Sequence, residues 1–289
     1  MEEYGPAGLE KRVRWLLGAL IVLNAVVMIF LAGEVKPGDI FDLRFTAGIF
    51  LMLFVCIHGW YQYGWPTMVN FFIITAVTTW LIESIGIKTG IPFGAFSYAD
   101  SLGIKIGDVP LMILPAYFFN GYLAWTMAIL ITGSQSNGSD RKSAMLVPFL
   151  AALLMVMWNM SFEPVMSTIE RHWIWSSGLW YGVPITNYTG WFITSASFFW
   201  IFYLYLSKRA KNQNSWRVYA LKPVHGYFFP VMYLVQGLPG LLHPFFRSGN
   251  TSIYRSVALT TALTMLPVAL VTILVIHIRL RMAADLNSR

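Results

Sequence analysis

Two glutamates have surroundings that could support acid–base chemistry away from water. Glu83 and Glu163 each lie near the end of a strongly apolar run, and each is followed by a segment rich in Gly, Pro and aromatic residues. Ionisable groups in membrane-spanning stretches are costly, so a functional site is the first hypothesis for them. A carboxyl removed from water favours its neutral form, which can donate a proton. We therefore expect Glu83 and Glu163 to be catalytic residues.

Aromatic side chains accompany both glutamates, and part of them could belong to the aromatic belt at a membrane interface. The faces of aromatic rings can also stabilise a cation that develops in a dry site. From these neighbourhoods the expected substrate-binding residues are Phe93, Phe96, Tyr98, Trp158, Trp175, Tyr181 and Trp191. Asn187 is added as a polar group that could orient a water molecule or a carboxyl. An acid, aromatic faces and a lipid surrounding together favour carbocation chemistry on an isoprenoid.

Three histidines also lie in apolar runs: His58, His225 and His277. For His58 and His277 a structural role is the simpler interpretation. No group of residues has the spacing of metal ligands, and no Gly-rich loop follows a strand to hold a nucleotide. We therefore expect neither a metal nor a cofactor.

The composition is that of a membrane protein, with 57% hydrophobic and 11% charged residues in a chain of 289. A spanning helix needs roughly 20 apolar residues. Candidate runs of about this length occupy residues 15–32, 45–63, 66–86, 109–132, 144–166, 185–206, 223–245 and 254–278. The sequence thus predicts an all-α, polytopic membrane helix bundle of about eight transmembrane helices, forming a single integral membrane domain over residues 1–289.

Basic residues set the expected orientation, because Lys and Arg concentrate in cytoplasmic connections. With an inside N-terminus, the basic clusters "KRVR" (11–14), "SKRAK" (207–211) and "RLR" (279–281) all fall on the inner side. We therefore expect both termini in the cytoplasm of a multi-pass protein of the cell membrane. The chain lacks a basic, aromatic-interleaved face on a soluble module, so nucleic acid is not an expected partner.

The two longest connections on the outer side suggest an internal repeat. Each follows a helix that carries one of the two glutamates, and each ends in a short motif that opens the next helix: "GDVP" (107–110) in the first and "YGVP" (181–184) in the second. The third and fourth expected helices would then repeat in parallel as the fifth and sixth. Such a repeat would bring both acids and both aromatic loops together near one membrane face.

The motifs "ESIGIKTGIPFGAFSY" (83–98), "GDVPLMILPAYFF" (107–119), "WNMSFEPVM" (158–166) and "WYGVPITNYTGW" (180–191) resemble the membrane-integral carotenoid biosynthesis hydratases. The family includes gamma-carotene and bisanhydrobacterioruberin hydratases, and the resemblance runs from about His58 to Trp191. The matching positions are Glu83, Gly86, Thr89, Gly90, Pro92, Phe93, Gly94, Phe96 and Tyr98, then Trp158, Glu163, Pro164, Gly182, Val183, Pro184, Asn187, Gly190 and Trp191. In this chain Asn159 stands where the family pattern has an acid, and we include it among the substrate-binding residues.

The resemblance implies a hydro-lyase that adds water to a trisubstituted double bond of a polyisoprenoid, such as the end group of a carotenoid, and gives a tertiary alcohol. One carboxylic acid would protonate the alkene and the other carboxylate would take a proton from the attacking water, with neither role assigned to either glutamate. The expected partners are therefore a membrane-embedded isoprenoid and water. Two alternatives stay open: hydration of a geranylgeranyl chain of archaeal ether phospholipid, and a small-molecule transporter or lipid-binding membrane protein.

Overall fold

The computed structural model describes residues 6–33, 43–133, 141–213 and 223–287. The longer helices are α1 (Pro6–Ala32), α2 (Leu43–Tyr63), α3 (Trp65–Thr89), α4 (Ile113–Thr132), α5 (Arg141–Met160), α6 (Ile185–Gln213), α8 (Phe228–Phe246) and α9 (Thr251–Asn287), with a short α7 (Pro223–Gly226). The strands are β1 (Phe96–Tyr98), β2 (Lys105–Ile106), β3 (Val109–Pro110) and β4 (Trp173–Trp175). The predicted all-α membrane bundle is confirmed.

Six helices in the described residues are long and apolar enough to span a membrane: α1, α2, α3, α4, α6 and α9. A shorter apolar stretch, Met145–Met160, lies in α5. The expected seventh span corresponds to α8, which contains Pro239 and Pro244 and is not among the six. Each of the eight apolar runs read from the sequence thus contains a helix, while six meet the length and hydropathy of a spanning segment.

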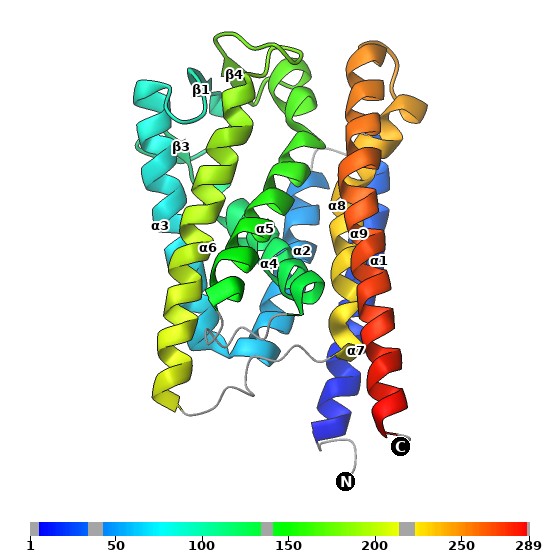
Figure 1. Cartoon of the computed structure of the whole chain (residues 1–289). Coiled ribbons are helices and arrows are strands. Elements are labelled where there is room, and N and C mark those ends of the chain that lie inside the picture. The colour runs from blue at the N-terminus through cyan, green and yellow to red at the C-terminus, as the bar shows by residue number, and fades with distance from the viewer. Residues whose placement is uncertain (1–5, 34–42, 134–140, 214–222, 288–289) are drawn as a thin grey trace.

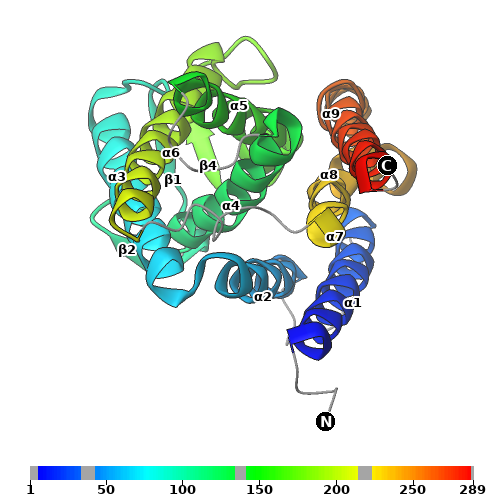
Figure 2. The same ribbon diagram turned by 60° about the horizontal axis from the view of Figure 1, so that its bottom comes forward.

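The helices stand side by side in two groups. Figure 2 shows α2, α3, α4, α5 and α6 arranged around one another, with α1, α8 and α9 grouped beside them. The start of α1 and the end of α9 lie at one end of the bundle, and β1 and β4 lie at the other (Figure 1). A single cluster of buried side chains joins the two groups, with Leu17 of α1 and Met232 of α8 packed in the same core as Trp125 of α4.

Helix α4 forms the centre of the bundle. Of its apolar stretch 78% is buried, compared with 28% for α3 and for α9. The largest fully buried side chains include Trp125 and Tyr122 of α4 and Phe71 of α3. Because aromatic rings bury a large apolar surface and pack edge to face, they can fill the space between helices that have few polar groups to pair.

Helix α5 ends just before the second glutamate. Its last residue is Met160, a turn follows at Ser161 and Phe162, and a π-helical segment covers Val165–Ile169. A break next to Pro164 follows from the missing N–H and the ring of proline, which disfavour continuous helix. The break turns the chain so that Glu163 lies inside the bundle, where it is 1% exposed.

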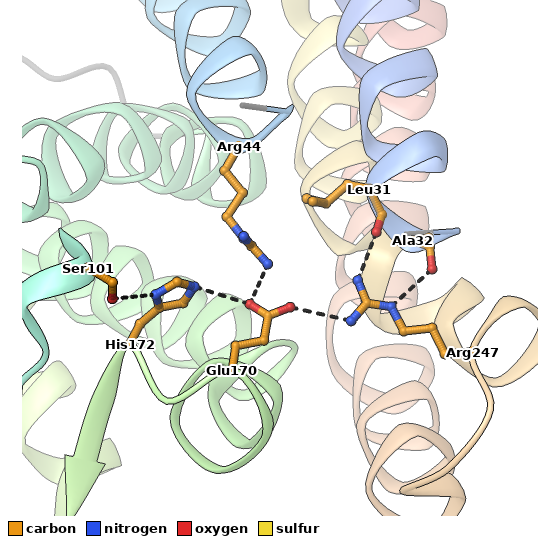
Figure 3. A network of polar contacts seen from close by, with 7 residues as sticks. All are labelled: Leu31, Ala32, Arg44, Ser101, Glu170, His172 and Arg247. Carbon is orange, nitrogen blue, oxygen red and sulfur yellow. Dashed lines mark hydrogen bonds and ion pairs between the residues drawn. The ribbon is translucent and has the colours of Figure 1, made fainter. Parts of the chain in front are cut away.

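An ion-pair network joins the helix ends at the same end of the bundle as β1 and β4. Figure 3 shows Glu170 between two arginines: Arg44 at the start of α2 and Arg247 after α8, with the Arg247 Nη1–Glu170 Oε1 distance at 3.3 Å. Arg247 also donates to the carbonyls of Leu31 and Ala32, at 2.9 and 3.2 Å, and so caps the end of α1. Since the last carbonyls of a helix lack intrahelical partners, this network ties α1, α2 and α8 to the segment after Glu163.

Candidate active site

The two aromatic loops meet as a pair of antiparallel strands above the glutamates. In the register of β1 and β4, Phe96 lies opposite Trp175, and Tyr98 lies opposite Trp173. Since alternate residues of a strand point to the same face, these four aromatic side chains share one face, and all four line the internal cavity. The residues between them, Ser97 and Ile174, are exposed. The loops that follow the two glutamates therefore come together, as the expected repeat requires.

Glu83 accepts hydrogen bonds from two phenols. Tyr98 of β1 donates to Oε2 at 3.1 Å, and Tyr117 of α4 donates to Oε1 at 3.0 Å. The glutamate is 3% exposed and lies six residues before the end of α3. Each carboxyl oxygen thus has one protein donor, and the carboxyl remains in contact with the cavity.

Glu163 accepts hydrogen bonds from two indoles and an amide. Trp173 and Trp175 of β4 both donate to Oε1, at 2.6 and 2.9 Å, and Asn159 donates to Oε2 at 2.8 Å. Asn187, in the first turn of α6, donates from its side-chain amide to the side-chain oxygen Oδ1 of Asn159 at 3.2 Å. The second glutamate therefore lies in a chain of donors that runs from α6 through the end of α5.

Aromatic rings stack beside the two carboxyls. The Tyr117 and Trp191 rings are parallel, with centroids 4.3 Å apart and planes at 9°. Trp158 lies edge to face with Trp191 at 5.8 Å. The phenol that donates to Glu83 is thus fixed in place by a stacked indole, and the π-faces of this group could stabilise a cation beside the acids.

The Phe93 ring fills a space between α3 and α6 that exists only because glycines line it. A Cβ at Gly86 of α3 would lie 2.6 Å from the Phe93 ring, and a Cβ at Gly190 of α6 would lie 2.3 Å from it. The Phe93 carbonyl accepts a hydrogen bond from Thr186 at 2.9 Å, which joins the same loop to α6. The two glycines therefore bring α3 and α6 close to the ring that supports β1.

One cavity of about 560 Å³ contains both carboxyls. Its walls come from helices α1 to α6 and α8, the strand pair and the π-helical segment, and they are mostly apolar side chains. Phe45 and Met52 of α2 and Met112 at the start of α4 line the cavity and are themselves 66, 37 and 46% exposed. The cavity therefore reaches the lateral surface of the bundle between α2 and α4, where lipid chains would lie in a membrane.

Most of the residues expected from the sequence line this cavity. They are Glu83, Glu163, Phe93, Phe96, Tyr98, Trp158, Trp175, Asn187 and Trp191. Asn159 is not a lining residue and instead contacts Glu163 from behind. Tyr181 lies away from the cavity: its hydroxyl is 2.8 Å from Ser256 Oγ and 3.2 Å from the Ser252 carbonyl, both on α9. The structure thus places Tyr181 at a loop–helix contact.

Tyr117 and Trp173 are site residues that the sequence reasoning did not select. Trp173 had a usable signal, because residues two apart in a strand share a face, so a strand that presents Trp175 to the site presents Trp173 as well. The sequence signal for Tyr117 was weaker, since this residue comes from another helix and 34 positions separate it from Glu83. Only the packing of α3 against α4 brings the phenol to the carboxyl.

The three histidines named from the sequence, His58, His225 and His277, lie outside the cavity. His58 is fully buried, and its Nδ1 lies 2.7 Å from the Tyr122 hydroxyl. The His58 and His225 rings pack edge to face at 5.8 Å. Within the described ranges, no three His, Cys, Asp or Glu residues cluster so that they could hold a metal ion.

The ion-pair network of Figure 3 also borders the cavity, because Arg44, Glu170 and Arg247 are lining residues. Burial alone would raise the pKa of Glu170. The hydrogen bond from His172 and the charges of Arg44 and Arg247 outweigh this effect and hold the pKa of Glu170 below its ordinary value. Glu170 is therefore ionised at neutral pH, and its charge lies between two guanidinium groups.

Comparison with known proteins supports the resemblance read from the motifs. The chain is 33% identical over 117 residues to the bisanhydrobacterioruberin hydratase of Haloarcula japonica. The aligned stretch covers 40% of this chain and 38% of that relative. No solved structure matches the chain significantly. A family model described as "Carotenoid biosynthesis protein" matches residues 43–277, which is most of the chain and includes the whole cavity except the contribution of α1. The chain is a member of the carotenoid biosynthesis protein family.

Proposed function

We propose that the protein is a hydratase that adds water across a trisubstituted double bond of a membrane-dissolved polyisoprenoid, with the end group of a carotenoid as the first candidate. The observation that carries the proposal is the pair of buried carboxyls, Glu83 and Glu163, in one aromatic-walled cavity. The name of the relative from Haloarcula japonica, a bisanhydrobacterioruberin hydratase, agrees with this chemistry.

The reaction begins with proton transfer from one carboxylic acid to the less substituted alkene carbon. The positive charge then forms on the tertiary carbon, where the rings of Tyr117, Trp158 and Trp191 stabilise it. Water adds to this carbon as the second carboxylate takes a proton from it. The balance is one water added, and the chain's own residues account for each proton without a cofactor.

The cavity suits a substrate that comes from the bilayer. Its surface opening between α2 and α4 is lined by Phe45, Met52 and Met112, so an apolar chain could enter sideways without crossing a headgroup layer. The carboxyls lie at the end of the bundle that holds the strand pair, close to the membrane surface, where water is available. A multi-pass position in the cell membrane follows as part of the proposal.

The test is expression of the protein in a host supplied in parallel with lycopene-type polyenes or with geranylgeranylated ether lipid, followed by mass spectrometry of the lipid extracts. A gain of one water on the polyene, absent from Glu83→Gln and Glu163→Gln, supports the carotenoid hydratase. A matched Asp100→Asn control removes an exposed carboxyl that pairs with Lys105 outside the cavity, and it should leave the product unchanged.

Hydration of a geranylgeranyl chain of ether phospholipid is a second candidate, because guanidinium groups that can bind a lipid phosphate line the cavity. Two guanidinium groups, Arg44 and Arg247, border the cavity around a single glutamate, Glu170. A neutral polyene makes no use of a guanidinium group, whereas a lipid phosphate would bind one. If the ether lipid gains water in the parallel experiment and the polyene does not, the second candidate replaces the first. If neither gains water, a transporter or lipid-binding function takes their place.

A further inference from the structure

We propose that the two carboxyls have fixed and different roles: Glu83 is the acid that protonates the alkene, and Glu163 is the base that takes the proton from water, with Trp173 and Trp175 as the residues that position it in its ionised form. The inference rests on the proposed hydratase function and adds to it the division of labour between the two glutamates. It follows from the kind of hydrogen-bond partner that each carboxyl has.

Oxygen Oε1 of Glu163 has no room for a proton. A carboxylate oxygen offers two lone pairs, and Oε1 receives an indole N–H from Trp173 at 2.6 Å and another from Trp175 at 2.9 Å. An indole nitrogen can donate a hydrogen bond and cannot accept one. Neither tryptophan can turn to accommodate a protonated Oε1, so this oxygen is held without a proton.

Oxygen Oε2 of Glu163 has amide partners in place of the two indoles. It accepts a hydrogen bond from the side-chain amide of Asn159 at 2.8 Å. The side-chain oxygen of Asn159 in turn accepts a hydrogen bond from Asn187. Because Glu163 lines the cavity and Oε1 is held by the two indoles, Oε2 is the oxygen at which this carboxyl takes up a proton. Hydrogen bonds to an ionised acceptor are shorter and stronger than neutral ones, and the indole and amide donors around Glu163 favour its charged form. Glu163 can thus wait as a carboxylate and take a proton at Oε2.

Glu83 has partners that tolerate either protonation state. Its two hydrogen bonds come from the hydroxyls of Tyr98 and Tyr117, at 3.1 and 3.0 Å, one on each oxygen. A phenol hydroxyl can donate or accept, so either tyrosine can rotate its hydrogen away and accept from a neutral carboxylic acid. Each oxygen also keeps a free lone pair where a proton can sit. Glu83 is therefore the carboxyl that can be loaded with a proton and deliver it.

The proton balance closes over one cycle. Glu83 gives its proton to the alkene carbon and becomes a carboxylate, and a C–H bond forms as the double bond breaks. Water then forms the C–O bond and releases its proton to Oε2 of Glu163. The two carboxyls have exchanged charge states, and transfer of one proton from Glu163 to Glu83 through water restores the resting state.

Deuterium exchange separates the two roles. In deuterium oxide, Glu163→Gln should still protonate the alkene through Glu83, and return of a hydrogen from the same carbon leaves deuterium in the recovered alkene. Hydration itself should fall by about 100-fold or more in this variant. Glu83→Gln should give neither product nor exchange. Glutamine at position 163 keeps a carbonyl oxygen for the two indoles, so the strand pair is preserved.

The outcomes are distinct. Exchange in Glu163→Gln together with none in Glu83→Gln supports the assignment. The opposite pattern overturns it, as does exchange in both variants or in neither, provided that the wild type hydrates its substrate. A wild type that hydrates neither polyene nor ether lipid removes the proposed function itself, and the assignment falls with it.

The positioning role of the tryptophans has its own readout. Trp173→Phe and Trp175→Phe keep an aromatic ring in the strand and remove one indole donor each, so a proton can settle on Oε1 at a higher pH. The low-pH limb of kcat/KM should then move upward by about one pH unit. Trp180→Phe is the matched control, since Trp180 lies in the same loop but outside the cavity lining. A uniform loss of activity with an unchanged pH profile would mean that Trp173 and Trp175 only support the fold.

Discussion

Tyr98 and Trp173 face each other across the strand pair and contact different glutamates. Their rings lie 6.2 Å apart at 75°, the phenol donates to Glu83, and the indole donates to Glu163. One cross-strand pair thus fixes a hydrogen bond to each carboxyl. Because one strand follows Glu83 and the other follows Glu163, neither loop alone could form this arrangement.

Removal of the Tyr117 hydroxyl should weaken the acid while the structure remains. Tyr117→Phe keeps the ring that stacks on Trp191 and loses the donor to Glu83 Oε1. We expect kcat to fall about tenfold, the rate equivalent of one net hydrogen bond. The measurement is hydration kinetics of the purified variant, with Tyr205→Phe as the control because Tyr205 contacts Arg209 on the same helix. Unchanged kinetics in Tyr117→Phe would show that this phenol does not assist proton transfer by Glu83.

The space that the Phe93 ring occupies should tolerate no side chain at Gly190 of α6. Gly190→Ala places a methyl group 2.3 Å from the Phe93 ring, and overpacking of this kind costs about 1–3 kcal/mol. We expect a lower unfolding temperature in detergent and lower activity, since the displaced loop carries β1. Gly18→Ala in α1 is the control, because the nearest side-chain atom to its new Cβ is 4.0 Å away.

A second substitution should restore the space beside Gly190. Phe93→Leu in the Gly190→Ala background replaces the ring with a smaller side chain and should recover part of the unfolding temperature. If the double variant is as unstable as the sum of the two single variants, the cost of Gly190→Ala has a cause other than the Phe93 ring.

The cavity can be filled from a position where the fold leaves space. A Cβ at Gly48 of α2 meets no atom within 4 Å, and Gly48 lines the cavity. In the series Gly48→Ala, Gly48→Leu and Gly48→Phe, we expect KM to rise with side-chain size while the unfolding temperature stays within a few degrees. Val69→Phe adds a ring on the exposed side of α3 as a control. Equal kinetics across the series would show that substrate does not occupy this part of the cavity.

The network around Glu170 should make stability depend on pH in the acidic range. Because the pKa of Glu170 is lower in the folded protein than its ordinary value of 4.5, its contribution is complete above about pH 4.5. The contribution decreases as the pH falls through the folded value. Thermal unfolding of the wild type should therefore shift downward by several degrees between pH 6 and pH 3, and part of this shift should be absent in Glu170→Gln. Asp100→Asn, at an exposed ion pair, should unfold with the pH profile of the wild type.

Apolar runs and breaks in the sequence predict most of this fold because a membrane leaves few choices. A backbone inside the bilayer must satisfy its own hydrogen bonds, so each long apolar run forms a helix, and Pro164 marks the end of α5 at about the right place. The predicted fifth helix extended to residue 166, whereas α5 ends at Met160. The turn at Ser161 and Phe162 depends on Ser161, whose hydroxyl donates to the Trp158 carbonyl at 2.6 Å, a contact that no periodicity reveals.

The carboxyls of the site were predictable, and only part of their surroundings was. Glu83 and Glu163 stand out because charged residues are rare in spanning runs, and the loops after them carry visible aromatic clusters. Arg44, Tyr117 and Arg247 reach the same cavity from α2, α4 and the end of α8, respectively. Their approach depends on helix packing across distances in sequence for which a single chain gives no pattern. The roles proposed for the two acids came only from the atoms that donate to each oxygen.

The measurement that tests the central claim most directly uses purified protein in lipid nanodiscs containing the substrate, in water labelled with heavy oxygen. The account predicts a tertiary alcohol whose oxygen comes from the labelled water, made by the wild type and by Asp100→Asn. It predicts at least about 100-fold less alcohol from Glu83→Gln and from Glu163→Gln, with both variants folded as judged by their unfolding temperatures. Alcohol formed at the wild-type rate by either glutamine variant would contradict the claim that these two carboxyls carry the reaction.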